Sequence, residues 1–205
     1  MEFIERIKDH FYQRSLPIHP ARSQGAVPRT VDQARSIGLL FNATDIDSRK
    51  QVLRYADQLR KSGKSVDLLG FIEQADKEAT FSFDFYTNKH VDWAQRPKGE
   101  AIARFLAKSF DIYICLFANS SPSSEYLALH APACLKIGPV SQHPDCYDLM
   151  LDMPANALPK QIIQQYDAIL AKARANSVLP TPVGPKKINV PIGFFGSFNP
   201  TLFLC

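Results

Sequence analysis

Polar side chains that could bind a ligand gather in two stretches, and each stretch directly follows an apolar run that predicts a β-strand. The first follows residues 36–43 and the second follows residues 111–117. In an open parallel sheet, ligands bind beyond the carboxyl ends of the strands. Carboxylates there suit a hard cation, and hydroxyls at a helix start suit a phosphate or carboxylate. The ligand-binding candidates are Asn42, Thr44, Asp45, Asp47, Asn119, Ser120, Ser121, Ser123 and Ser124.

The same residue types also have a purely structural use, because Asp and Ser cap helices and satisfy turns. Two acidic residues near a helix start are what the helix dipole favours, so Asp45 and Asp47 need no metal ion to explain them. Asp47 or Ser48 is the predicted N-cap of the helix, and Gly63 its predicted C-cap. We therefore predict no metal site and no cofactor.

Sequence motifs of several enzyme classes are absent. The chain has no GxGxxG, GxxxxGK[ST], GxSxG, HExxH or EF-hand pattern, and the turn after the first strand contains no glycine. These absences argue against a nucleotide hydrolase, a serine hydrolase and a zinc peptidase. Two weaker candidates remain, a loop with His143 and Asp145, and a loop with His90, Asp92 and Trp93.

The elements that would position these residues read as alternating strands and helices. Residues 36–72 form one strand–helix–strand unit, which predicts parallel pairing through a right-handed crossover. Residues 81–87 alternate as an edge strand does, and residues 111–117 are apolar enough for the sheet centre. We predict an α/β three-layer sandwich with a mostly parallel sheet of about five or six strands. The predicted strands are 36–43, 65–72, 81–87, 111–117, 133–137 and 147–152, and the last helix is 157–175.

An amphipathic helix over residues 2–13 precedes this domain. Phe3, Ile4, Ile7 and Phe11 recur at helical spacing, so the stripe must pack on the body of the chain, on a partner or on a second subunit. A basic linker follows, and residues 1–64 carry a net charge of +5 against −1 for the rest. The linker is either a solvated segment or a contact for RNA, DNA or an acidic protein surface. The interaction candidates are Phe3, Ile7, Phe11, Arg14, Arg22, Arg29 and Arg35.

Composition and spacing divide the chain into three parts. Residues 1–35 are the N-terminal helix and linker, 36–175 a single α/β domain, and 176–205 a proline-rich apolar tail. Four cysteines without short metal-ligand spacing predict buried thiols at Cys115 and Cys134 and a more exposed one at Cys146. No apolar run is long enough to span a bilayer and the start has no secretory h-region, so the expected location is the cytoplasm.

Five ordered phrases carry a family resemblance: residues 37–45, 63–71, 110–116, 133–138 and 147–151. They resemble a small cytoplasmic family of unknown function from bacteria of the Bacteroidota group, over about residues 1–172. Residues 110–138 are also similar to the N-terminal half of heptosyltransferase-type glycosyltransferases. Those enzymes bind the nucleotide sugar largely through a second α/β domain, for which this chain has no room. Neither resemblance assigns a role to any residue.

The sequence thus favours a non-enzymatic cytosolic domain that binds a protein partner or itself through the N-terminal helix. The alternative is a small-molecule binder or transferase-like enzyme that takes a nucleotide or sugar phosphate at the strand-end loops. Contact with nucleic acid through the basic linker is a third possibility.

Overall fold

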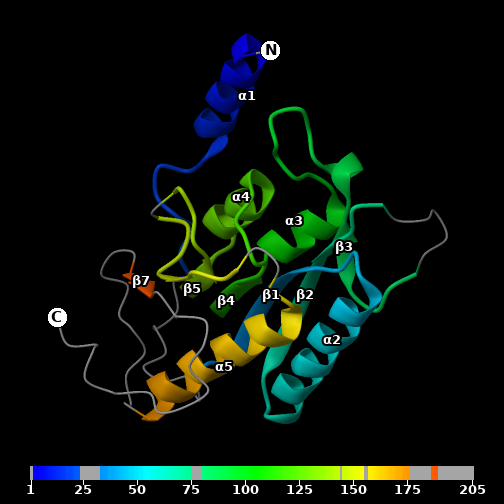
Figure 1. The fold of residues 1–205 in the computed structure, drawn as a ribbon, viewed down its shortest axis with the longest axis vertical. Coiled ribbons are helices and arrows are strands. Elements are labelled where there is room, and N and C mark those ends of the chain that lie inside the picture. Colours follow the sequence, from blue (N-terminus) through cyan, green and yellow to red (C-terminus); the bar gives the residue numbers. More distant parts are fainter. Residues whose placement is uncertain are drawn as a thin grey trace.

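The computed structural model describes residues 2–23, 33–74, 80–143, 145–154, 157–175 and 186–188. Within them, one parallel seven-stranded sheet has the strand order β3-β2-β1-β4-β5-β6-β7 (Figure 1). The strands are β1 Ser36–Asn42, β2 Ser65–Phe71, β3 Asp84–Tyr86, β4 Phe110–Leu116, β5 Ala133–Pro139, β6 Leu149–Leu151 and β7 Lys186–Ile188.

Helices cover both faces of the sheet, which confirms the predicted α/β sandwich. α2 and α5 pack on one face, where Val52 and Tyr166 join a core with Ile37 and Leu39. α3 and α4 pack on the other face, around Tyr113. The helices are α1 Glu2–Ser15, α2 Ile46–Lys61, α3 Glu100–Leu106, α4 Pro122–His130 and α5 Pro159–Ala175, with a short 3-10 helix η1 Asn88–His90.

All six predicted strands are present, and their places in the sheet follow from their composition. β4 lies at the centre and β3 at the edge, as predicted. β3 is shorter than predicted, with three residues, because Phe81 and Phe83 precede it and pack against the core under α2. A seventh strand, β7, lies within the region predicted as a proline-rich tail, residues 176–205, and pairs with β6; the sequence did not predict it.

The order of the strands places the two polar turns side by side. β1 pairs with β2 on one side and with β4 on the other, so Phe41 and Leu116 are neighbours near the carboxyl ends of their strands. The chain winds toward β2 and β3 first, and then returns past β1 to β4. The turns after β1 and β4 therefore leave the same edge of the sheet at adjacent positions.

The ends of α2 differ in part from the prediction. The N-cap is Asp45, whose carboxylate accepts a hydrogen bond from Ser48 N at 2.8 Å, and not Asp47 or Ser48. The helix begins at Ile46, and its capping residue lies two positions before Asp47 and three before Ser48. At the other end the C-cap is Ser62, and Gly63 follows with a φ of 82°, a conformation that favours glycine.

α4 is covered on its outer side by the N-terminal strap, which we define as residues 12–22. Tyr12 Oη donates to the carbonyl oxygen of Pro122 at 2.8 Å, at the start of α4. Ala21 N donates to Leu129 O at 2.7 Å, near its end. The strap thus runs along the whole helix, and this explains why α4 has no polar face.

A close approach at Gly138 leads to a first prediction. A Cβ atom at this position of β5 would lie 2.3 Å from Cε1 of Tyr147, a ring that is 1% exposed. We expect Gly138→Ala to lower the free energy of unfolding by about 1–3 kcal/mol, the usual cost of overpacking. Urea unfolding followed by circular dichroism measures it. Gly63→Ala serves as a comparison that meets no atom within 4 Å and is strained only through its φ.

Candidate functional site

The turn after β1 satisfies its own polar groups. Asn42 Oδ1 accepts a hydrogen bond from Thr44 N at 3.0 Å, and Thr44 Oγ1 accepts one from Glu73 N at 3.1 Å. The second bond ties this turn to the segment that follows β2. Both side chains remain on the surface, but their acceptor oxygens already stabilise the backbone of the turn.

The two aspartates of this turn point to different partners. Asp45 accepts from both the amide and the hydroxyl of Ser48, and these donors lower the pKa of its carboxyl. Asp47 is exposed and lies 3.7 Å from Lys50 Nζ. Among the described residues, no group of three or more His, Cys, Asp or Glu side chains is arranged to hold a metal ion.

The serines after β4 build the first turn of α4. Ser121 is the N-cap, and a reciprocal pair of bonds with Ser124 forms a capping box: Ser121 N donates to Ser124 Oγ at 2.9 Å, and Ser124 N donates to Ser121 Oγ at 3.3 Å. Ser123 Oγ lies 3.3 Å from Ser121 Oγ. Asn119 is exposed in the same turn. The hydroxyls of Ser121, Ser123 and Ser124 therefore contact groups within the first turn of the helix, which is what a capping role predicts.

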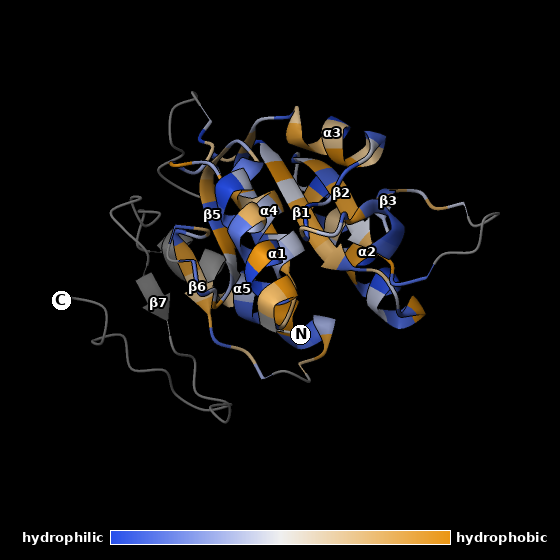
Figure 2. Ribbon diagram, turned by 90° about the horizontal axis from the view of Figure 1, so that it is seen from above, coloured by the Kyte–Doolittle hydropathy of each residue, from blue (hydrophilic) through white to orange (hydrophobic). Residues whose placement is uncertain are grey.

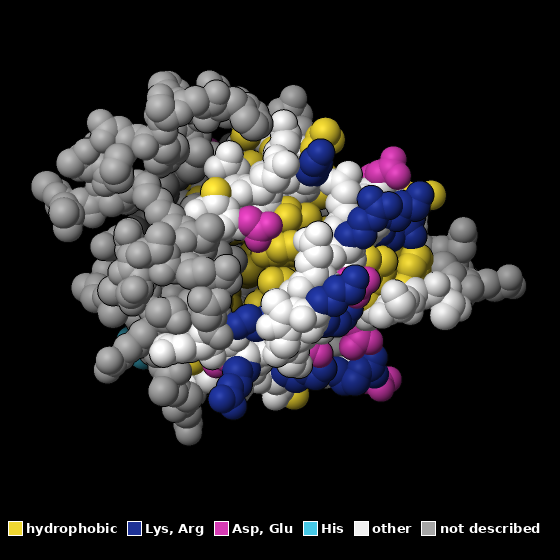
Figure 3. All heavy atoms as spheres, turned by 90° about the horizontal axis from the view of Figure 1, so that it is seen from below, with side chains coloured by type: hydrophobic (Ala, Val, Ile, Leu, Met, Phe, Trp, Pro, Cys, Tyr) yellow, Lys and Arg dark blue, Asp and Glu magenta, His cyan; other side chains and the backbone are white. Residues whose placement is uncertain are grey.

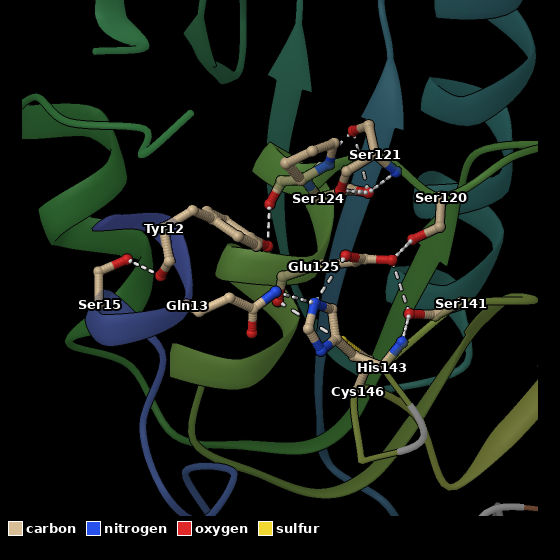
Figure 4. Close-up of polar contacts among 11 residues, drawn as sticks. Tyr12, Gln13, Ser15, Ser120, Ser121, Ser124, Glu125, Ser141, His143 and Cys146 are labelled. Carbon is tan, nitrogen blue, oxygen red and sulfur yellow. Dashed lines mark hydrogen bonds and ion pairs between the residues drawn. The ribbon is translucent and has the colours of Figure 1, made fainter. Parts of the chain in front are cut away.

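Beside this turn lies a polar cluster around the buried carboxylate of Glu125 (Figure 4). Glu125 Oε1 accepts hydrogen bonds from Ser120 Oγ at 2.9 Å and from Ser141 Oγ at 2.6 Å. Ser120 comes from the turn after β4 and Ser141 from the loop after β5. The carboxylate thus joins two adjacent loops at the carboxyl edge of the sheet.

His143 completes the cluster and connects it to α1. Its Nε2 lies 3.7 Å from Glu125 Oε2 and 3.4 Å from Gln13 Nε2. The Tyr12 ring is 6.1 Å from the His143 ring, and burial together with Glu125 raises the pKa of the Tyr12 phenol. The end of α1 therefore contacts the Glu125 cluster through Tyr12 and Gln13.

The base that contacts the serine hydroxyls of the cluster is the Glu125 carboxylate and not the His143 imidazole. Activation of a serine requires a base within hydrogen-bond reach of the hydroxyl. In the described part of the chain, the hydroxyls of Ser120 and Ser141 both donate to Glu125, and neither bonds to the imidazole of His143. His143 meets Glu125 rather than Asp145, its predicted companion, which is exposed.

The three cysteines in the described part of the chain, Cys115, Cys134 and Cys146, are buried. Cys115 and Cys134 are buried as predicted, but the predicted exposure of Cys146 is wrong, since it is 0% exposed. Its Sγ lies 3.9 Å from the carbonyl oxygen of Glu125, within the same cluster. Burial raises the pKa of both Cys115 and Cys146 to about 12, so neither thiol is ionised at neutral pH.

The arginines of the linker do not form one surface. Arg22 makes a bidentate ion pair with Asp148, with both N–O distances at 2.7 Å. Arg14 lies on α1 at the carboxyl edge, and Arg35 precedes β1 at the opposite edge. Arg29 lies outside the described residues. At the face opposite α1, Lys and Arg side chains are interrupted by acidic and apolar ones (Figure 3).

The loop after β3 is held by its own ion pairs. Asp92 Oδ2 lies 2.8 Å from both Arg96 and Lys98, and these two cations hold the pKa of its carboxyl below the usual range against the opposing effect of burial. His90 Nδ1 accepts from Thr87 N at 3.0 Å. Trp93 is 55% exposed and its ring centroid lies 5.1 Å from that of Phe11. This loop therefore meets α1.

The sequence prediction missed Glu125, Ser141 and Tyr12. One signal was available for Glu125, because it is an ionisable residue on a helix whose neighbours are mostly apolar. No local signal marks Ser141, whose partner lies sixteen positions away. Tyr12 was read as part of a helix that projects its apolar stripe, but it is the residue that anchors that helix.

Comparisons with known proteins agree with the expected resemblance at the level of a family. No curated protein matches the chain. No helix among the described residues is long and apolar enough to cross a membrane. The family of unknown function DUF6913 matches residues 8–171, which include α2 to α4, all strands from β1 to β6 and most of α1 and α5. The chain therefore belongs to the DUF6913 family of unknown function.

Proposed function

We propose that this protein is a non-catalytic interaction protein that binds a protein partner or a second copy of itself through the α1 stripe, which we define as Phe3, Ile4, Ile7 and Phe11. One observation supports the proposal: the apolar side chains of the α1 stripe are exposed. Its side chains are 74, 60, 36 and 47% exposed, respectively. Viewed from above, α1 lies over the sheet and carries hydrophobic positions (Figure 2).

α1 differs from an ordinary surface helix, because its apolar stripe is not buried against the core. Such a helix normally turns its apolar side to the core. Here Tyr12, which is about 100° around the helix from Phe11, is the buried residue, at 5% exposure. α1 is fixed to the body at its end, through Tyr12, whereas polar residues before it, such as Glu5 and Asp9, are exposed like the α1 stripe. The stripe is thus accessible to another molecule.

Trp93 enlarges the surface that the α1 stripe offers. Its exposed ring packs edge-on against Phe11. Exposed aromatic residues that lie together are typical anchors of protein interfaces. A contact with nucleic acid has less support, since Arg22 is already paired with Asp148 and Arg14 and Arg35 lie at opposite edges.

A charge placed in the α1 stripe tests the proposal. We expect Ile7→Asp to abolish a self-association seen by light scattering, or the capture of a partner by cross-linking, with no loss of thermal stability. Ile18→Asp is the matched control, because Ile18 is 92% exposed outside the α1 stripe. If Ile7→Asp and the wild type behave alike in both assays, the α1 stripe is not an interface.

A second candidate function is the binding of a small molecule between the turns after β1 and β4. The observation that favours it is the reversal of strand order at this point, the place where Rossmann-like sheets bind ligands. The likeness of residues 110–138 to half of a heptosyltransferase-type enzyme makes sugar phosphates and nucleotides the first ligands to try. A ligand at 100 times its Kd raises the free energy of unfolding by about 2.7 kcal/mol, so a thermal-shift screen detects it. An unchanged melting temperature across the panel rejects this candidate.

The proposal also keeps the cytoplasm as the expected location. Fractionation of cells that express the full chain tests it, and recovery in the membrane or secreted fraction contradicts it.

A further inference from the structure

We propose that the C-terminal segment, residues 189–205, is an intramolecular occupant of the α1 stripe and competes there with the external partner. This inference rests on the proposed function, because it concerns the regulation of the same surface. Three features support it: the place where the chain leaves the sheet, the length of the segment, and its chemistry.

The segment begins at the edge of the sheet where α1 stands. β7 runs parallel to β6, with Ile188 opposite Leu151, so the chain leaves β7 at the carboxyl edge. α1 is fixed to the same edge, because Tyr12 bonds to Pro122 at the start of the helix that follows β4. The segment therefore starts on the side of the molecule that carries the α1 stripe.

The segment is also long enough to reach the stripe. It has 17 residues after Ile188, and an extended chain of that length spans up to about 55 Å. β7 lies three strand positions from β4, about 14 Å at the usual strand spacing, and the 14 residues of α1 extend about 21 Å further. The length of the segment therefore exceeds its distance from the α1 stripe, even if the segment is not fully extended.

The chemistry of the two surfaces matches. Residues 189–205 contain no Asp, Glu, Lys, Arg or His. Its apolar side chains are Val190, Ile192, Phe194, Phe195, Phe198, Leu202, Phe203 and Leu204. The α1 stripe is likewise uncharged, and the nearby Lys8 is paired with Glu5 at 2.9 Å. Both surfaces lose exposed apolar area when they meet, which is the driving force expected for such a contact.

Trp93 provides a probe at the stripe, since it is the only tryptophan and contacts Phe11. We would place a nitroxide quencher in the segment with Ser197→Cys in a Cys205→Ser background. Labelling is selective, because Cys115, Cys134 and Cys146 are at most 3% exposed. We expect the label to remove most of the Trp93 emission, independently of protein concentration.

Two multiple variants test whether the quenching depends on the apolar side chains of the segment. Phe194→Ser with Phe195→Ser and Phe198→Ser should restore the emission of the labelled chain. Val178→Ser with Leu179→Ser, which change residues before β7, should leave the quenching intact. Unquenched emission in the labelled parent chain, or quenching that survives the triple variant, overturns the proposal. Quenching that grows with concentration, or that a labelled chain imposes on an unlabelled one, assigns the segment to a second copy and also overturns it.

A binding measurement separates this inference from the proposed function. Binding is measured to an identified partner or, where the protein self-associates, to a second copy. The triple variant should bind with higher affinity than the wild type, and Ile7→Asp with lower affinity. Loss of binding in Ile7→Asp with no gain in the triple variant leaves the α1 stripe as an interface and rejects the segment as its competitor. No effect of Ile7→Asp rejects the interface itself.

Discussion

Deletion of residues 1–23 should remove most of the stability of this protein, whereas deletion of residues 1–10 should leave the fold intact. The longer deletion takes away the N-terminal strap that covers α4. Tyr12 is 5% exposed, and Leu16 packs against the core on the α4 face. Loss of one large buried side chain costs about 3–5 kcal/mol, and a whole domain is stable by only about 5–15 kcal/mol.

Other contacts of the strap add to this loss. Ala21 N no longer donates to Leu129 O, and Asp148 loses both hydrogen bonds from Arg22. Asp148 is 8% exposed, so its carboxylate would remain in a mostly buried position with fewer partners. Leaving such a group without its counterion is more costly than the pair is stabilising.

The comparison of the two deletions is the measurement. Urea unfolding of both variants, followed by far-ultraviolet circular dichroism, gives the midpoints. The shorter deletion keeps Tyr12, Gln13, Leu16 and Arg22, so it serves as the control for removal of α1 residues that do not touch the body. Equal midpoints for the two deletions would show that the strap does not stabilise the domain. The result also decides how partner binding can be tested, because only the shorter deletion removes most of the α1 stripe from a folded domain.

The order of strands and helices could be predicted because it depends on local patterns. The run at Ile112–Leu116 is apolar on both sides, and this indicates a strand covered by helices on both faces. The alternation of Phe81, Phe83 and Phe85 indicated an edge strand, because only one side of that run is apolar. In both cases the information lies within seven residues, although only Asp84–Tyr86 of the second run forms a strand in the structure.

The contacts that hold α1 could not be predicted in this way. Tyr12 and Pro122 are 110 positions apart, and Arg22 and Asp148 are 126 apart. Nothing in the local sequence distinguishes Arg22 from Arg14, yet Arg22 forms a bidentate ion pair and Arg14 is exposed at the end of α1. The candidate ligand residues have the same difficulty, since Asp45 and Ser121 carry the same local signal whether they cap a helix or bind a ligand.

Lys136 is the least expected member of the interior, and its position has a specific cause. It is 0% exposed, and its Nζ donates to Ala128 O at 2.5 Å. In a continuing helix that carbonyl would accept from residue 132, but Pro132 has no N–H to donate. Lys136 therefore satisfies a buried carbonyl at the end of α4 that the backbone leaves without a donor.

This position makes stability depend on pH in a defined direction. Burial, aided by the charge of Arg22, lowers the pKa of Lys136 from 10.5 to about 7. Between these two values the unfolded chain binds a proton that the folded chain does not, so stability rises as pH rises. The slope is about 1.4 kcal/mol per pH unit for one proton. Below pH 7 both states bind the proton, and the charged amine then destabilises the folded state by its full amount.

Lys136→Met should abolish that slope. We expect urea unfolding between pH 7 and 9.5 to show the wild type gaining several kcal/mol relative to the variant, at about 1.4 kcal/mol per unit. Cys115 and Cys146, whose thiols ionise in the unfolded chain near the upper end of this range, oppose the trend equally in both proteins, so their effect cancels in the difference. The range ends below pH 10, where tyrosines also begin to ionise in the unfolded chain. Lys136→Met also leaves Ala128 O without a donor, a cost of about 1–3 kcal/mol that is the same at every pH. The difference in slope between the two proteins therefore measures the buried amine alone, and parallel slopes would mean that Lys136 keeps an ordinary pKa in the folded protein.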